Sequence, residues 1–283
     1  MSLRLKSWFR HPLGALIAEL VILALPLNAA YRFAMQIVYR LEAIWGALFA
    51  LVAAVVACNA YNLYARFIAR RAADELAPRH AGGALYGLAL GALLIGIVVA
   101  ALALARVAKF DAGGAFARAG LPGVAILAGT LEELVARGVV LRNLENVFGS
   151  FAAIALSALL FASLHIGNPG ATPLSIAALG IEGGVMLGAV YVATRSLWWT
   201  AGIHAAWNFT QTGLFGIADS GHSGQGLLRT ELVGPDWLTG AAFGIEASLV
   251  SVVLCVIVAA LFLIYAHRRG HFVPPFWKRT HAI

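Results

Sequence analysis

Six polar side chains stand out because apolar sequence surrounds them on both sides. Charged and imidazole groups in such surroundings are costly, so each of them needs a partner or a purpose. A carboxylate there can act as a general base toward water, and an imidazole beside an amide can donate hydrogen bonds to an oxyanion. The set therefore predicts hydrolytic chemistry. Its members are Glu132, Glu133, Arg137, His165, His204 and Asn208.

The spacing of the first three residues assigns them different tasks. On a helix, Glu133 and Arg137 are four residues apart on one face, in the favourable order for an ion pair. Glu132 is rotated by about 100° from Glu133, so it faces another way. We expect Glu132 to be free to serve a site.

The same four-residue spacing recurs twice further along the chain. His204 and Asn208 present an imidazole and an amide side by side, and Phe161 and His165 repeat the spacing one helix earlier. Three helices could therefore direct one carboxylate, two imidazoles and one amide toward a shared pocket. The chain has no serine elbow and no His-Glu-x-x-His motif, and both cysteines lie far from the cluster, which disfavours a covalent nucleophile.

The elements that must position these residues are transmembrane helices. Of 283 residues, 61% are apolar and 12% charged, against roughly a quarter charged in a soluble domain. This excludes a soluble globule, intrinsic disorder and a coiled coil, and two cysteines exclude a disulfide scaffold. A span needs about 20 apolar residues. Eight windows fit, namely 13–31, 43–64, 84–105, 119–141, 150–166, 173–194, 197–216 and 247–266.

The predicted fold class is all-α, a polytopic integral membrane protein with about eight transmembrane helices in a single domain, residues 1–283. With the N-terminus inside, 13 of the 20 Lys and Arg residues fall on cytoplasmic segments, which predicts that both termini are cytoplasmic. Basic residues that flank helices face anionic headgroups, so the net charge of +7 requires no nucleic acid. The length of the first span and its internal Glu19 favour an anchor over a signal peptide.

Three motifs on the predicted spans resemble a known family. LEELVARG contains Glu-Glu-x-x-x-Arg, FASLH contains Phe-x-x-x-His, and HAAWN contains His-x-x-x-Asn. In this order they are similar to the intramembrane CAAX proteases and bacteriocin-processing enzymes, the CPBP or Abi family, related to the type II CAAX prenyl endopeptidase. The resemblance covers about residues 119–212, which we expect to form the protease core.

The resemblance implies a role for each motif residue. Glu132 and His165 would activate the attacking water, and His204 and Asn208 would form the oxyanion pocket. The residues that would orient the first carboxylate and hold the helix pair together are Glu133 and Arg137.

A zinc-dependent version of the same protease is an alternative, since the family has also been described as metal-dependent. His165, His204 and one carboxylate could form a His₂Glu set. Three side chains on three separate helices have no metal-specific spacing, so we rank the metal-free mechanism first and expect no cofactor.

Two interpretations without proteolysis remain open. The Glu133–Arg137 pair could be structural, and the other four side chains could form hydrogen bonds between packed helices. The same groups could also form the ion relay of a proton-coupled transporter. Such transporters more often have two related halves and broken helices, and the sequence has neither.

Three further features have plain interpretations. Glu182 is expected to hydrogen-bond to a neighbouring helix, and Gly180, Gly184 and Gly188 to form a packing face. The segment 217–239 is expected to be a simple connection rather than a lid.

The expected partners are membrane lipid and a peptide or protein substrate. The resemblance allows a lipidated substrate without requiring one. Short connections and alanine-rich spans are typical of bacterial membrane proteins, which predicts a multi-pass protein of a bacterial plasma membrane.

Overall fold

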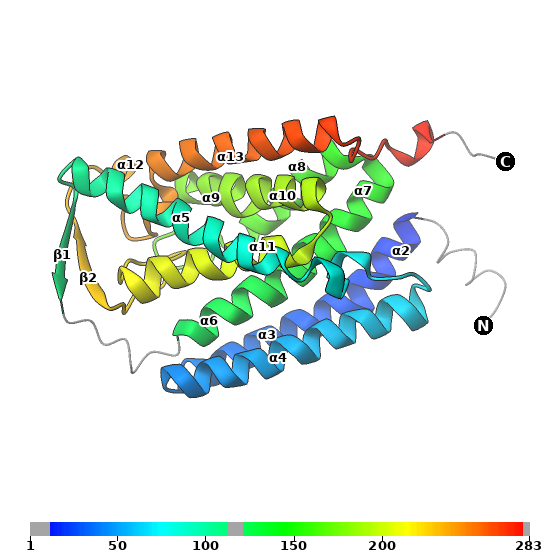
Figure 1. Ribbon diagram of the computed structural model, residues 1–283, viewed down its shortest axis with the longest axis horizontal. Helices are drawn as coiled ribbons and strands as arrows, with labels where there is room; N and C mark the ends of the chain where they lie inside the picture. Colours follow the sequence, from blue (N-terminus) through cyan, green and yellow to red (C-terminus); the bar gives the residue numbers. More distant parts are fainter. Residues whose placement is uncertain (1–11, 113–120, 280–283) are drawn as a thin grey trace.

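The protein is almost entirely helical, and its long helices run side by side (Figure 1). The computed structural model describes residues 12–112 and 121–279. The α-helices are α2 (Pro12–Glu19), α3 (Leu25–Val38), α4 (Ala43–Leu63), α5 (Gly83–Leu104), α6 (Leu121–Leu127), α7 (Arg142–Phe148), α8 (Ser150–Ser163), α9 (Pro173–Leu179), α10 (Leu187–Thr194), α11 (Leu197–Asn208), α12 (Asp236–Thr239) and α13 (Leu249–Arg268).

Short π-helical and 3₁₀ segments join these helices. The π-helical segments are η1 (Leu20–Ala24), η2 (Tyr64–Ile68), η6 (Ala128–Glu132), η7 (Leu134–Leu141), η8 (Gly180–Met186) and η9 (Phe209–Leu214). The 3₁₀ turns are η3 (Asp74–Leu76), η4 (Pro78–His80), η10 (Ile245–Ala247) and η11 (Phe276–Lys278). Several predicted spans therefore combine α-helical and π-helical turns in one continuous helix. The motif helix of Glu132, for example, runs from Leu121 to Phe148 and ends at Gly149, whose φ is 82°.

Each predicted span coincides with a helical segment among the described residues, and five helices are long and apolar enough to cross a membrane. Their outward faces carry exposed large apolar side chains, such as Val52, Leu85 and Leu261, which suit contact with lipid. The protein is therefore embedded in a membrane and crosses it several times. The five helices are Pro12–Val38, Ala43–Ile68, Pro78–Leu104, Pro173–Thr194 and Leu249–Arg268.

The three other predicted spans stay predictions as membrane crossings. Helix α8 has 14 residues, about 21 Å of helix, which is shorter than a hydrocarbon core of about 30 Å. The windows 119–141 and 197–216 form helices that carry the polar motif residues. The first and last described residues lie at the same end of the bundle, as an even number of crossings requires (Figure 1). Of the basic residues that set the predicted orientation, Arg4, Lys6, Arg10 and Arg118 lie outside the described residues.

A small antiparallel sheet departs from the all-α prediction. Strands β1 (Ala108–Ala112) and β2 (Leu228–Leu232) pair with Phe110 opposite Thr230. They lie beside the bundle at the end opposite the chain termini (Figure 1). The pairing joins two connections far apart in sequence, and such non-local pairing leaves no mark in either segment alone.

Small residues bring the motif helices close together. A Cβ on Gly202 of α11 would lie 2.5 Å from the Ala84 carbonyl oxygen of α5, and one on Gly129 would lie 2.6 Å from Ala205 of α11. Larger residues at these places would force the backbones apart. The predicted packing face is also confirmed, because a Cβ on Gly184 would lie 2.5 Å from Ala158 of α8.

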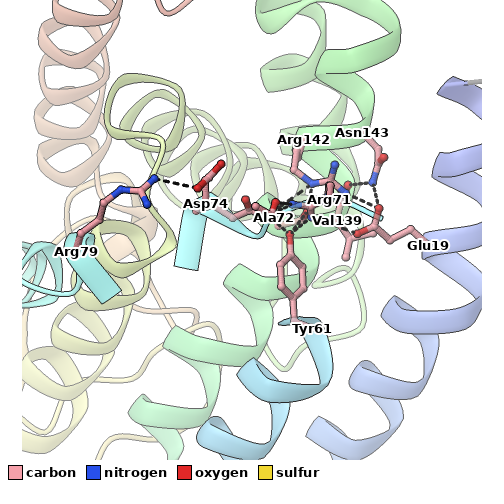
Figure 2. Close-up of polar contacts among 11 residues, drawn as sticks. Glu19, Tyr61, Arg71, Ala72, Asp74, Arg79, Val139, Arg142 and Asn143 are labelled. Atoms are coloured by element: carbon pink, nitrogen blue, oxygen red, sulfur yellow. Dashed lines mark hydrogen bonds and ion pairs between the residues drawn. The ribbon is translucent and has the colours of Figure 1, made fainter. Parts of the chain in front are cut away.

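A buried ionic cluster joins α2 to α7 and to the segment that follows α4 (Figure 2). Glu19 pairs with Arg142 and, at 3.8 Å, with Arg71. Arg71 in turn pairs with Glu75 at 2.8 Å and donates to the Tyr61 hydroxyl at 2.8 Å. Two glutamates and two arginines balance in charge, so this cluster fastens the N-terminal helices to the rest of the bundle.

Candidate active site

Glu132 and Glu133 lie at the junction of two π-helical segments, η6 and η7. Such segments widen the helix locally and are frequent at functional sites. Glu133 is fully buried, whereas the side chain of Glu132 is 20% exposed and faces a cavity. The hydroxyl of Tyr31, on α3, donates a hydrogen bond of 2.6 Å to Glu132 Oε1. The two adjacent carboxylates therefore face different surroundings, as their helical rotation predicts.

His204 on α11 lies between these two carboxylates. Its Nδ1 is 3.0 Å from Glu133 Oε1, and its Nε2 is 3.9 Å from Glu132 Oε2. An ionised carboxylate only accepts hydrogen bonds, so the Nδ1 of His204 carries the proton of the shorter contact. Arg137 donates to the same Glu133 oxygen at 2.6 Å. The predicted ion pair is present, and it also holds the imidazole in one orientation.

His165 follows the last turn of α8 and is oriented by the backbone. Its Nδ1 donates to the Phe161 carbonyl oxygen at 2.9 Å, which leaves Nε2 unprotonated in the neutral ring. The Phe161 ring lies 4.9 Å from the His165 ring and 6.4 Å from the His204 ring, and the Arg137 guanidinium stands 5.2 Å from it. Phe161 therefore packs the two histidines and the arginine of the three motifs together.

All four predicted catalytic residues line one cavity of about 900 Å³. Glu132 enters from η6, His165 from the turn after α8, and His204 and Asn208 from α11. The side-chain amide of Asn208 makes no hydrogen bond with any residue that the structure describes. It is therefore available to a ligand. The two supporting residues, Glu133 and Arg137, lie behind His204 rather than in the cavity wall.

The segment after η9 corrects the prediction of a simple connection. Asp219 through Ser223 line the cavity, and Asp219 and His222 form an isolated antiparallel bridge. Asn168 donates to the Ser220 carbonyl oxygen at 2.8 Å, and the Gly221 amide donates to Phe243 at 2.7 Å. These contacts hold the segment against loops that are distant in sequence, so it forms a wall of the site. Its polar residues gave no periodic signal that could have shown this.

Two acidic residues, one in this wall and one beside it, have pKa values far above their ordinary range. Burial raises the pKa of Asp219 to about 6, an effect that His204 opposes and Glu132 reinforces. Burial and the neighbouring Asp219 raise the pKa of Glu246 to about 8. Glu246 also accepts hydrogen bonds from Gln211 and from the Ser220 amide, so it fastens the wall to η9 and η10.

Glu182 corrects a second prediction. It was expected to hydrogen-bond to a neighbouring helix, but neither of its carboxylate oxygens has a hydrogen-bond partner among the described residues. Its side chain is buried and lines the same cavity from η8. Tyr31, Asp219 and Glu246 are further polar residues of the cavity that motif spacing missed, because they come from elements outside the three motifs.

The zinc alternative would need three ligands close to one point. Within residues 12–112 and 121–279, no three His, Cys, Asp or Glu side chains stand close enough to share a metal ion. The Nδ1 of His204 is bonded to Glu133, and the Nδ1 of His165 to a carbonyl oxygen, which orients both rings without engaging Nε2. The side chains instead form hydrogen-bonded units that suit water and a carbonyl group.

The comparisons with known proteins concern the same part of the chain. Residues 115–210 match the family model described as type II CAAX prenyl endopeptidase Rce1-like. The match supports a CAAX protease family for this region. The matched range contains Glu132, His165, His204 and Asn208, and the family is one of proteases that act on a protein or peptide substrate in a membrane. No curated protein and no solved structure matches the chain.

Proposed function

We propose that this protein is an intramembrane endopeptidase that hydrolyses a peptide bond of a membrane-associated substrate with a water molecule activated by Glu132 and His165. The observation that carries the proposal is the convergence of Glu132, His165, His204 and Asn208 on one cavity, within the region that matches a protease family. A transporter would need a relay that continues across the membrane. The cavity instead gathers the parts of a single hydrolytic site.

Glu132 is the general base of the first step. It takes one proton of the water while the water oxygen attacks the carbonyl carbon of the peptide bond. The unprotonated Nε2 of His165 accepts a hydrogen bond from the same water and orients it. Tyr31 holds Glu132 by donating to Oε1, which leaves Oε2 for the proton. The carbonyl electrons move to oxygen and form a tetrahedral oxyanion.

His204 and Asn208 stabilise this oxyanion. Asn208 donates from its amide, and His204 donates from Nε2, a role that requires a proton on both ring nitrogens with a carboxylate on each side of the ring. Fixed donors at a developing negative charge contribute more than donors that must reorient. Glu133, with Arg137 as its counter-ion, supplies that fixed orientation by holding Nδ1.

Collapse of the intermediate completes the reaction. The oxyanion electrons return to the carbonyl, the carbon–nitrogen bond breaks, and the proton held by Glu132 passes to the leaving amine. One peptide bond and one water yield one carboxylic acid and one amine. The side chains supply every proton transfer, so we propose a mechanism without a metal ion.

The finer points of topology and location are part of the same proposal. We propose eight crossings with both termini in the cytoplasm, supported by the excess of Lys and Arg on that side and by the common end of the described chain. The short connections and alanine-rich spans support a bacterial plasma membrane. The substrate is a membrane-associated peptide or protein, with a lipid anchor as one variant to test.

The test compares wild type with Glu132→Gln, both purified in detergent, on quenched fluorescent peptides that include a farnesylated one. We expect kcat/KM to fall about 10³-fold, because the base is lost while the shape of the side chain is kept. Glu231→Gln, a change of an exposed glutamate on β2, is the matched control and should cleave like wild type. Equal cleavage by all three proteins would refute the protease, and inhibition of wild type by a chelator would refute the metal-free mechanism.

A further inference from the structure

The cavity contains two buried carboxyl groups that the hydrolytic mechanism does not use. Glu182 lies on η8 with 3% of its surface exposed, and Glu246 lies on η10 with 1% exposed. Both line the cavity that holds the catalytic residues. Neither contacts the four groups proposed to handle the water and the oxyanion.

These two glutamates differ from the other buried glutamates of the described chain. Glu19, Glu75, Glu133 and Glu145 each form an ion pair with an arginine. Glu182 and Glu246 have no such pair among the described residues. The two buried glutamates that lack an arginine are therefore also the two that face the cavity.

The hydrogen bonds of the two side chains sharpen this difference. Both oxygens of Glu182 are buried and have no hydrogen-bond partner in the described structure. A buried carboxyl group without hydrogen bonds carries the full desolvation penalty of that group. Glu246 accepts from Gln211 and Ser220, which fix its position but leave its carboxyl group without a cation. A donor that enters the cavity would relieve both deficits.

The charge of the whole cavity favours a cation as that donor. Four carboxyl groups line it, those of Glu132, Glu182, Asp219 and Glu246, and the cationic groups among its described lining residues are Arg32 and, in the proposed mechanism, His204. Arg32 is exposed on α3, whereas Glu182 is buried on η8. A cationic side chain would be attracted to the carboxyl groups of the cavity, and an anionic side chain would be repelled by them.

Glu182 also lies close to the catalytic histidines, through the residue that follows it. The next residue, Gly183, packs so closely on Phe161 that an added Cβ would lie 2.4 Å from the ring. Phe161 in turn contacts the rings of His165 and His204. A substrate segment bound at Glu182 would therefore extend into the space where its peptide bond is attacked.

We propose that Glu182 and Glu246 form a subsite that binds a lysine or arginine side chain of the substrate. This inference rests on the proposed endopeptidase function and names the class of substrate it takes: a membrane-associated polypeptide with a basic residue near the cleaved bond. Glu182 supplies the free carboxylate oxygens. Glu246, fixed by its two hydrogen bonds, supplies the second negative charge by releasing its proton when the cation enters.

The test measures binding separately from cleavage. Fluorescent peptides that differ at one position, with lysine, norleucine or glutamate, are bound to the Glu132→Gln protein in detergent, and empty micelles serve as the background. Moving the varied position along the peptide locates the subsite. At one position we expect the lysine peptide to bind at least tenfold more tightly than the norleucine peptide, and the glutamate peptide to bind most weakly.

Variants then assign the preference to this subsite. Adding Glu182→Gln should bring the ratio of lysine to norleucine affinities toward one, whereas adding the exposed control Glu231→Gln should leave the ratio intact. If the Glu182→Gln protein does not fold, the same ratio in Glu246→Gln decides the matter. The subsite would be overturned if the ratio of lysine to norleucine affinities were near one at every position. It would also be overturned if the preference for lysine persisted after the loss of both glutamates.

Failure of the proposed function gives a different result. If the lysine peptide binds preferentially but wild type cleaves it no faster than Glu132→Gln does, the subsite stands and the endopeptidase does not. If wild type cleaves all peptides without regard to charge, the endopeptidase stands and the subsite does not.

Discussion

The ionic cluster around Glu19 and the cavity around Glu132 both bury carboxylates, but they treat these groups differently. In the cluster, Glu19 and Glu75 share Arg71 and Arg142, so each charge has an opposite charge within 4 Å (Figure 2). In the cavity, carboxyl groups outnumber guanidinium groups, and Glu182 has neither an ion pair nor a hydrogen bond among the described residues.

This difference separates stabilising charges from functional ones. The charged groups of a mutually paired cluster have few free positions for a ligand. Removing one partner of such a pair leaves the other charge buried without compensation. Groups that face a cavity without partners are held there by the fold and can interact with what enters. Substitutions in the cluster should therefore lower stability, whereas substitutions in the cavity should lower activity.

The largest effect is expected from His204→Ala. It removes an oxyanion donor and also leaves Glu133 without its imidazole partner, so kcat should fall about 10³-fold. Peptide cleavage under saturating substrate measures this, with thermal unfolding as a check of folding. His267→Ala, a change of an exposed histidine at the end of α13, should keep full activity. A similar loss in both variants would contradict the assignment of His204.

Glu19→Gln should be the most damaging change in the ionic cluster. It leaves the largely buried Arg142, whose side chain is 15% exposed, without its closest carboxylate and should lower the free energy of unfolding by about 3 kcal/mol. Asp74→Asn breaks the pair with Arg79, whose side chains are 69% and 64% exposed, and should change stability little. Thermal unfolding in detergent compares the two. A loss of kcat in folded Glu19→Gln protein would contradict the assignment of the cluster to stability alone.

Tyr31→Phe should have a smaller effect, confined to activity. It removes the hydrogen bond to Glu132 Oε1 and keeps the ring that packs there, so kcat/KM should fall about tenfold. Steady-state cleavage measures the change. If activity is unaltered, Glu132 is positioned by other groups, and the contribution of α3 to the site is structural.

Glu246→Gln should alter the pH dependence of stability by a few degrees in Tm. Burial raises the pKa of Glu246 from 4.5 to about 8. Between those values the folded chain keeps a proton that the unfolded chain has released, so this carboxyl lowers stability as the pH rises and has no further effect above 8. The Tm of wild type should thus decline more from pH 5 to 8 than that of the variant. Glu42→Gln, at an exposed turn, should follow wild type, and parallel curves for all three would contradict the shift.

The membrane class, the helical segments and the three motifs could be predicted from sequence because each depends on local pattern. A run of about 20 apolar residues marks a helix wherever it lies in the chain. The spacing of Glu133 and Arg137 fixes their contact within one helix, and the structure has that contact at 2.6 Å. The motif residues could be named for the same reason.

Only the tertiary structure decided how these local units meet. That His204 lies between Glu132 and Glu133 depends on the approach of two helices at Gly129 and Ala205. The sheet of β1 and β2, the hydrogen bond from Tyr31 and the wall formed by residues 219–223 likewise join segments far apart in the chain.

Glu182 shows most clearly where prediction from the sequence ends. Its sequence position resembles that of any polar residue on a packed helix, for which a hydrogen bond to a neighbour is the reasonable expectation. Whether such a partner exists depends on which side chains the other helices bring near, and here they bring Glu246 and a cavity. The sequence by itself determined which residues could do chemistry, because type and spacing are local properties. The tertiary structure decided which of them were left without a partner, because pairing in a folded chain is not local.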